Sequence, residues 1–263
     1  MLTRAQKDHL LIPILVLQTI GANLGSMLTP LGNPQNLYLY ALSGMTIRQF
    51  LSVMAGPTAL SLLLLAAMTL FIKPEPLAAS RAVRSQPVCA QQALLWVILF
   101  LVCLLAVVRM VPYGLALVCV IAGAILFDRA ILFRADYHLL LTFSFLFVFI
   151  GNIKSLPAVS SALSALVGGR ELIVGILLSQ VISNVPAAML LSKFTADYPA
   201  LLIGVNFGGL GTLIASMASL ISYKLYASTP GAQTGRYLLV FTALNLVFLS
   251  VLWAAAVLCG SLA

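Results

Sequence analysis

The chain has 263 residues, of which 62% are hydrophobic and 8% are charged, and its formal net charge is +8. Soluble globular domains carry roughly 25% charged residues, so this composition excludes that class and predicts an all-α polytopic membrane protein. In such a protein basic residues gather in cytoplasmic loops. The charge therefore indicates orientation in a lipid bilayer, and we expect no nucleic-acid partner.

Apolar runs predict where the chain crosses the membrane, because about 20 apolar residues span the hydrocarbon core. Uninterrupted runs lie at residues 50–72, 93–109, 113–127, 138–150 and 238–259. Two further crossings, residues 10–41 and 199–226, are interrupted by glycine and polar residues. Residues 153–167 are too rich in serine to span and are expected along the interface. No small-residue cleavage site follows the first run, so we expect no cleaved signal peptide.

The two interrupted crossings contain the same motif. Residues 21–37 read GANLGSMLTPLGNPQNL and residues 204–220 read GVNFGGLGTLIASMASL. Aligned without a gap, they share five identical positions: Gly21/Gly204, Asn23/Asn206, Gly25/Gly208, Thr29/Thr212 and Leu37/Leu220. Glycine and asparagine weaken a helix, and free backbone groups are tolerated in a bilayer only where protein buries them or a cavity receives them. Corresponding interruptions in two halves of a chain are typical of a secondary transporter's binding site.

Residues 171–194 have two possible arrangements, because Ser183-Asn184-Val185-Pro186 breaks them in the middle. Each half is about 11 residues, roughly 16 Å of helix. The segment is either one kinked crossing or a re-entrant hairpin. With a hairpin the 14 basic residues divide nine to five between the two sides, and with a crossing they divide seven to seven. The hairpin keeps the bias of the positive-inside rule and predicts a cytoplasmic N-terminus and an extracytoplasmic C-terminus in a cell (inner) membrane.

Neutral polar residues at these three places are the candidate binding residues. They are Asn23, Gly25, Ser26, Thr29, Asn33, Gln35 and Asn36 at the first break, Asn206, Gly208, Gly209, Thr212, Ser216 and Ser219 at the second, and Ser183, Asn184 and Pro186 in the hairpin. Amide, hydroxyl and carbonyl oxygens suit a desolvated cation, and half-helix N-termini attract an anion. Candidate Na⁺ ligands are Asn23, Ser26 and Thr29, and separately Ser183, Asn184, Asn206 and Gly208. The alternative is that small residues only let helices pack closely.

The sequence offers little for other chemistry. Every acid falls at the end of a predicted span, which argues against a buried carboxylate proton relay. The chain contains no Walker loop, no zinc-ligand spacing and no nucleophile–base arrangement. We therefore expect no enzyme activity and no cofactor other than Na⁺ or H⁺ as the coupling ion.

Three segments resemble the ion transporter superfamily, which includes citrate transporters, divalent anion–sodium symporters and arsenite efflux permeases. They are residues 21–40, 179–192 and 204–226, and the runs GNPQN and SNVPA are most similar to the citrate-transporter and arsenite-permease branches. The resemblance implies an inverted-repeat, elevator-type homodimer with the tip at Ser183 and Asn184 facing residues 208–212. A complete member begins with scaffold helices and a first hairpin, whereas this chain opens directly at the broken helix, so on this resemblance about the first third of a complete member is missing. A misassigned start, a split gene or a remnant would each account for that.

On this template residues 1–72 and 171–263 form the transport part, 73–92 a cytoplasmic linker, and 93–168 the scaffold helices with an interfacial arm. The predicted function is secondary transport of a small anion, carboxylate- or oxyanion-like, coupled to Na⁺ or H⁺. Alternatives are arsenite-type oxyanion efflux or Na⁺/H⁺ antiport, and a truncated membrane remnant that does not transport. Dicarboxylate symporters resemble Ser-Asn-Thr at the hairpin tip, whereas this chain has Val185 at the third position.

Overall fold

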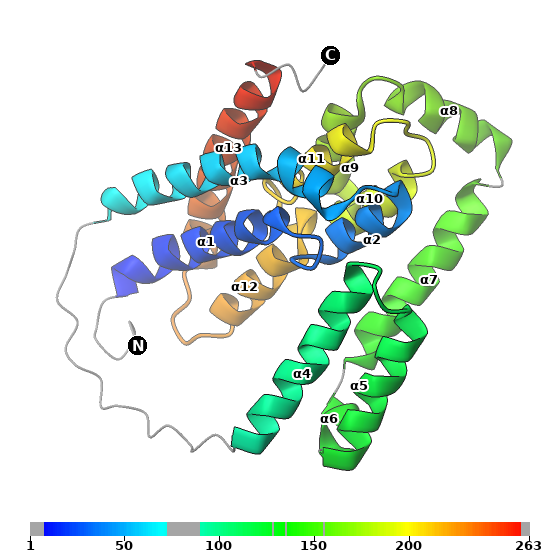
Figure 1. Cartoon of the computed structure of the whole chain (residues 1–263). Helices are drawn as coiled ribbons and strands as arrows, with labels where there is room; N and C mark the ends of the chain where they lie inside the picture. The colour runs from blue at the N-terminus through cyan, green and yellow to red at the C-terminus, as the bar shows by residue number, and fades with distance from the viewer. Residues whose placement is uncertain (1–7, 73–89, 128, 135, 155, 259–263) are drawn as a thin grey trace. The chain divides into compact units, whose positions relative to one another are not determined.

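The computed structural model describes residues 8–72, 90–127, 129–134, 136–154 and 156–258. Within these residues all regular structure is helical (Figure 1). Contacts divide the chain into two compact units, unit 1 with Met1–Ser80 and Val148–Ala263, and unit 2 with Arg81–Phe147. Residues 73–89 of the predicted linker lie outside the described residues, and the predicted division into transport and scaffold parts stays a prediction.

Unit 1 contains both copies of the repeated motif and the segment between residues 171 and 194. Its helices are α1 (Asp8–Gly25), η2 (Ser26–Leu28), α2 (Pro34–Ser43), α3 (Ile47–Leu70), α8 (Pro157–Val167), α9 (Glu171–Ile182), α10 (Asn184–Leu191), α11 (Tyr198–Phe207), η3 (Leu213–Ala215), α12 (Met217–Ala227) and α13 (Thr234–Leu258). Its largest fully buried side chains include Phe50, Phe207, Tyr237, Phe241 and Phe248. The core therefore joins α3, α11 and α13.

Unit 2 is built on the helical pair α4 (Ala90–Val107) and α5 (Tyr113–Phe127), which pack against each other. Their close approach needs Gly123, because a Cβ there would lie 2.7 Å from Leu99 Cδ1. The short α6 (Arg129–Arg134) follows, and α7 (Tyr137–Lys154) runs across the boundary between the two units.

Helix length and composition confirm an all-α polytopic membrane protein. Among the described residues, four segments are long and apolar enough to cross a bilayer: Leu10–Leu28, Ile47–Leu70, Ala90–Val107 and Thr234–Leu258. The bent pair Leu140–Ile153 and Pro157–Val167 adds a fifth if the two helices form one span. The predicted crossing at residues 113–127 is a shorter apolar helix.

Both interrupted crossings are broken at the predicted places. After the first break α2 restarts at Pro34, and its N-cap Asn33 accepts a hydrogen bond from the backbone N–H of Asn36 at 2.9 Å. After the second, α12 restarts at Met217, and its N-cap Ser216 accepts from the backbone N–H of Ser219 at 3.1 Å. Asn33 and Asn36 align with Ser216 and Ser219 in the repeat. Each copy thus restarts its helix with the same kind of side-chain cap.

Helices α9 and α10 form a hairpin, which decides between the two arrangements of residues 171–194. Thr195, just after α10, donates from its hydroxyl to Oε1 of Glu171 at the start of α9, over 3.2 Å. A continuous helix would separate these two residues by about 36 Å. The chain therefore returns to the level at which α9 began, and a single kinked crossing is excluded.

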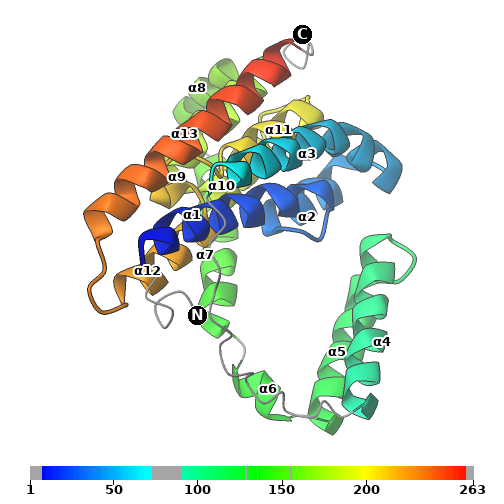
Figure 2. The ribbon, with the colours of Figure 1, turned by 90° about the vertical axis from the view of Figure 1, so that its left-hand side faces the viewer.

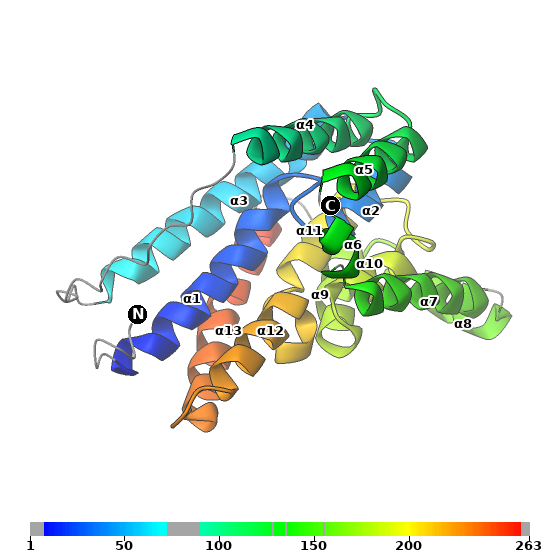
Figure 3. The same ribbon diagram turned by 90° about the horizontal axis from the view of Figure 1, so that it is seen from below.

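The return of the hairpin makes the two broken helices antiparallel. The first half-helix of one copy packs on the second half-helix of the other, since α1 contacts α12 and α2 contacts α11. Figure 3 shows α12 alongside α1 with the chain running the opposite way. Helices α3 and α13 also pack against α1, and Figure 2 shows α3 following its length. The two breaks consequently lie against each other within unit 1.

Candidate functional site

The two breaks are joined through Asn23, near the end of α1. Its amide nitrogen donates to the carbonyl oxygen of Gly209 at 3.3 Å and to Ser219 Oγ at 3.5 Å, while its Oδ1 accepts from Ser216 Oγ at 3.0 Å. Ser216 is the N-cap of α12. Asn23 thus connects the first half-helix of one copy to the start of the second half-helix of the other.

Asn206, which aligns with Asn23, makes the reverse connection. Its Oδ1 accepts from Asn33 Nδ2 at 3.0 Å, and its Nδ2 donates to Asn36 Oδ1 at 2.7 Å and to the carbonyl oxygen of Leu202 at 2.8 Å. Asn206 is 2% exposed and Asn36 is fully buried. Each motif asparagine therefore binds the helix cap of the other copy and the residue three positions after that cap.

The backbone of the first break is held by its own polar side chains. Asn36 Nδ2 donates to the carbonyl oxygens of Met27 at 3.0 Å and Thr29 at 3.2 Å, which satisfies acceptors that the interruption frees. Ser26 Oγ donates to the carbonyl oxygen of Asn23 at 2.9 Å and accepts from Asn33 Nδ2 at 3.3 Å. A Cβ on Gly32 would overlap the carbonyl oxygen of Ser26. Only glycine fits at this position.

The hairpin tip meets the second break. Ser183 joins α9 to α10 with a positive φ of 74° and an extended ψ of 154°, and its hydroxyl donates to the carbonyl oxygen of Ala215 at 3.4 Å. A non-glycine residue rarely adopts this backbone conformation. A Cβ on Gly209 would lie 2.9 Å from Asn184 Nδ2, so the Asn184 amide lies directly against the break.

Asn184 has a buried amide with no hydrogen-bond partner among the described residues. Asn184 is 6% exposed. Gln35, 3% exposed, also has a side-chain amide with no hydrogen-bond partner among the described residues. Among those residues no completely inaccessible side-chain nitrogen or oxygen lacks a partner. The amide atoms of Asn184 and Gln35 therefore keep some accessible surface. An unpaired polar group in such a place is available to bind a solute.

The structure brings only some of the predicted residues together. Asn23, Ser26, Asn33, Asn206 and Gly209 belong to one hydrogen-bonded cluster, beside Asn184. Gly25, Thr29 and Thr212 are exposed. Pro186 lies in the first turn of α10, where the missing N–H costs little. Both predicted Na⁺ ligand sets stay predictions.

Two further residues, neither of them among the candidates predicted from the sequence, hold the second break. Gln180 of α9 donates from Nε2 to the carbonyl oxygens of Gly208 and Leu210, each at 2.9 Å. Asn245 of α13, fully buried, accepts at Oδ1 from the N–H of Gly211 at 3.4 Å. The available signal was an amide residue within an otherwise apolar helix, a position that needs a specific partner.

The cluster presents dipoles and neutral oxygens, because its side chains are amides and hydroxyls. The N-termini of α2, α10 and α12 begin at or beside its residues and carry partial positive charge. The one buried acid of the described residues, Glu171, lies at the base of the hairpin, away from the tip. The described residues contain no group of three or more His, Cys, Asp or Glu that could hold a metal ion.

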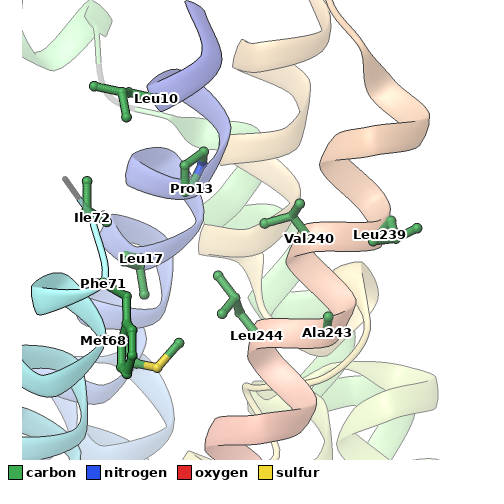
Figure 4. Close-up of a pocket in the computed structure, with 10 residues that line it drawn as sticks. All are labelled: Leu10, Pro13, Leu17, Met68, Phe71, Ile72, Leu239, Val240, Ala243 and Leu244. Atoms are coloured by element: carbon green, nitrogen blue, oxygen red, sulfur yellow. The ribbon is translucent and has the colours of Figure 1, made fainter.

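A hollow of about 600 Å³ lies elsewhere in unit 1. Figure 4 shows its walls, which come from α1, α13 and the end of α3. The lining side chains are all apolar: Leu10, Pro13, Leu17, Met68, Phe71, Ile72, Leu239, Val240, Ala243 and Leu244. It offers no group that would recognise an anion, and it lies toward the beginning of α1 rather than at the break.

Comparison with known proteins agrees with this architecture. The family model described as Citrate transporter (CitMHS) matches residues 1–201. The chain belongs to the citrate transporter family. It is 32% identical to an uncharacterized transporter of Methanocaldococcus jannaschii, over 92% of this chain and 66% of that protein. It is also 32% identical to the inner membrane protein YbiR of Escherichia coli, over 81% of this chain and 58% of that one.

A third relative, the 46 kDa membrane protein of Mycobacterium leprae, is 26% identical over 82% of this chain and 60% of its own length. The chain thus spans 58–66% of the length of these relatives. No solved structure matches it. Family membership and the apolar helices identify a multi-pass membrane protein of a transporter family. The match to the citrate transporter family covers the first break and the hairpin, and the second break lies beyond it.

Proposed function

We propose that the chain carries out secondary active transport of a small anion, carboxylate- or oxyanion-like, coupled to Na⁺ or H⁺. The observation that carries this proposal is the unpaired amide of Asn184, 6% exposed, which lies against Gly209 where the two broken helices meet. A solute can therefore bind this amide without breaking a hydrogen bond of the fold.

The cluster offers suitable groups for both the transported anion and the coupling cation. The N-termini of α2, α10 and α12 favour negative charge, and the amide and hydroxyl oxygens of Asn23, Ser26 and Ser183 favour a small desolvated cation. Citrate is the first substrate to test, given the family. Dicarboxylate symporters resemble Ser-Asn-Thr at the hairpin tip, and Val185 lacks the hydroxyl of that threonine. Arsenite is therefore tested beside the carboxylates.

The antiparallel breaks support transport rather than a purely structural role. Two inverted copies that exchange hydrogen bonds around one site can favour either side of the membrane by nearly symmetric rearrangements. We extend the proposal to a homodimer, which the family resemblance implies, with its N-terminus in the cytoplasm. The distribution of basic residues favours that orientation.

Uptake into proteoliposomes tests the function. The purified chain is reconstituted, and accumulation of radiolabelled citrate, succinate and arsenite is measured under an inward Na⁺ gradient, an inward proton gradient and no gradient. We expect gradient-dependent accumulation of one anion, and its loss in Asn184→Ala. The matched control is Thr58→Val, which removes a hydroxyl that is 3% exposed and bonds only within α3, to the carbonyl oxygen of Met54 at 2.7 Å.

The variant is informative because Asn184 forms no hydrogen bond that its loss would break. Asn184→Ala should therefore fold as well as the parent chain while losing uptake. Absence of accumulation for every anion under every gradient would refute coupled uptake. Full activity of Asn184→Ala would refute the assignment of the site.

A further inference from the structure

The unwound stretch between α11 and η3 has backbone groups that form no hydrogen bond within their own helices. The side chain of Gln180 forms hydrogen bonds with three of these groups. Gln180 donates from Nε2 to the carbonyl oxygens of Gly208 and Leu210, and to that of Ile176 in its own helix at 3.1 Å. Its Oε1 accepts from the backbone N–H of Thr212 at 2.9 Å. A single amide thus replaces three contacts that an unbroken helix would have made itself.

The second break also donates a hydrogen bond to Gln180. The hydroxyl of Thr212 donates to the backbone carbonyl oxygen of Gln180 at 3.1 Å. That carbonyl belongs to the last turn of α9, where no intrahelical N–H is available. Gly211, with φ 109°, passes so close that a Cβ there would overlap Gln180 Oε1. The side chain of Gln180 and the backbone of residues 208–212 therefore fit each other in one conformation.

Glycine contacts hold the same two elements together along their length. A Cβ on Gly204 would lie 2.6 Å from the carbonyl oxygen of Leu172, and one on Gly208 would lie 2.5 Å from Ser179 Oγ. Helix α9 is thus packed on α11 at backbone distance, as small residues allow in membrane proteins. Gln180 lies at the end of this contact, three residues before the tip at Ser183.

We propose that Gln180 is a positioning residue that fixes the second break against the hairpin tip, so that Asn184 and the break bind solute as one preformed unit. This rests on the transport function proposed above. Without Gln180 the carbonyls of Gly208 and Leu210 and the N–H of Thr212 lose their partner and reorient. The solute then has to order the break as it binds, which weakens binding without removing a group that touches the solute.

The matched variants are Gln180→Met and Gln180→Glu. Met keeps the length of the side chain and removes every hydrogen bond. Glu keeps an acceptor for the N–H of Thr212, but places negative charge against the carbonyls of Gly208 and Leu210. Ser179→Ala is the control, since Ser179 is the neighbouring residue, is fully buried, and bonds only to the carbonyl oxygen of Gly175 in its own helix, at 2.6 Å.

Two measurements are made on the reconstituted full chain. Hydrogen exchange of the amides of residues 208–215 reports the break directly. We expect it to rise by about tenfold in Gln180→Met, the effect of losing one net hydrogen bond, and to stay unchanged in Ser179→Ala. Radiolabelled citrate uptake reports binding, and we expect the half-saturating citrate concentration to rise by about tenfold while the maximal rate falls less than twofold.

Each result decides a separate point. Unchanged exchange in both Gln180 variants overturns the positioning role whatever happens to uptake. Faster exchange with an unaltered half-saturating citrate concentration reduces Gln180 to a structural residue and also overturns it. If the parent chain takes up no citrate, the transport function fails for this probe. Protection of residues 208–215 by citrate, lost in Gln180→Met but kept in Ser179→Ala, would then still support positioning, and its absence would overturn it.

Discussion

The exchanged asparagine contacts predict an energetic coupling that can be measured without knowing the substrate. Asn206→Ala removes one hydrogen bond from Asn33, one to Asn36 and one to the carbonyl oxygen of Leu202. It also leaves Asn36 Oδ1 without the partner at 2.7 Å, in a side chain that is fully buried.

The expected magnitude follows from these contacts. Side-chain hydrogen bonds between membrane helices average about 0.6 kcal/mol and reach about 1.7 kcal/mol. Three lost bonds, one of which leaves a buried acceptor unpaired, should lower the free energy of unfolding by about 2–4 kcal/mol. A double-mutant cycle with Asn36→Ala should give a coupling of about 0.6–1.7 kcal/mol.

The assay is unfolding in mixed micelles with increasing dodecyl sulfate, followed by circular dichroism. The parallel cycle of Asn206→Ala with Thr58→Val provides the reference, because the two side chains share no partner and their effects should add within about 0.5 kcal/mol. A coupling between Asn206 and Asn36 no larger than that reference would refute the exchanged contact.

Three further predictions concern backbone conformation and orientation. Gly32→Ala should reduce the yield of folded protein by more than half on size-exclusion chromatography, because its Cβ would overlap the carbonyl oxygen of Ser26, whereas Gly56→Ala, with nothing within 4 Å, should be tolerated. At Ser183, where φ is 74° and ψ is 154°, substitution by valine should cost about 1–3 kcal/mol more than substitution by glycine, measured in the same unfolding assay. Cysteines introduced at Thr46 and at Ser80 should react with an impermeant maleimide from opposite sides of the membrane, Thr46 from outside intact cells, and labelling of both from one side would contradict the predicted orientation.

The sequence determined the class and the position of the breaks. In a bilayer, an apolar run of about 20 residues satisfies its own backbone N–H and C=O groups by forming a helix. The four long segments are such helices. The interruptions were readable because glycine and asparagine recur at corresponding places in two apolar segments. The structure adds that Gly32 makes a close contact and that Asn33 and Ser216 are helix caps. Even the hairpin was favoured by counting basic residues, and the bond between Thr195 and Glu171 decided it.

The sequence could not determine which residues meet across the repeats. The alignment pairs Asn23 with Asn206, but it does not say which residues these two side chains bind. In the fold each binds the helix cap of the opposite copy: Asn23 binds Ser216, and Asn206 binds Asn33. Contacts between residues more than 170 positions apart depend on the packing of whole helices, which no local pattern encodes.

Gln180 is a second residue whose partners the sequence could not reveal. Its position in an apolar helix marks it as unusual, but its partners at Gly208, Leu210 and Thr212 follow only from the close packing of α9 on α11. The sequence by itself thus determined the helices and the places where they break, because these obey rules of a few neighbouring residues. Tertiary structure alone decided which freed backbone groups were satisfied, and that the amides of Asn184 and Gln35 have no hydrogen-bond partner among the described residues, because both depend on distances between elements far apart in the chain.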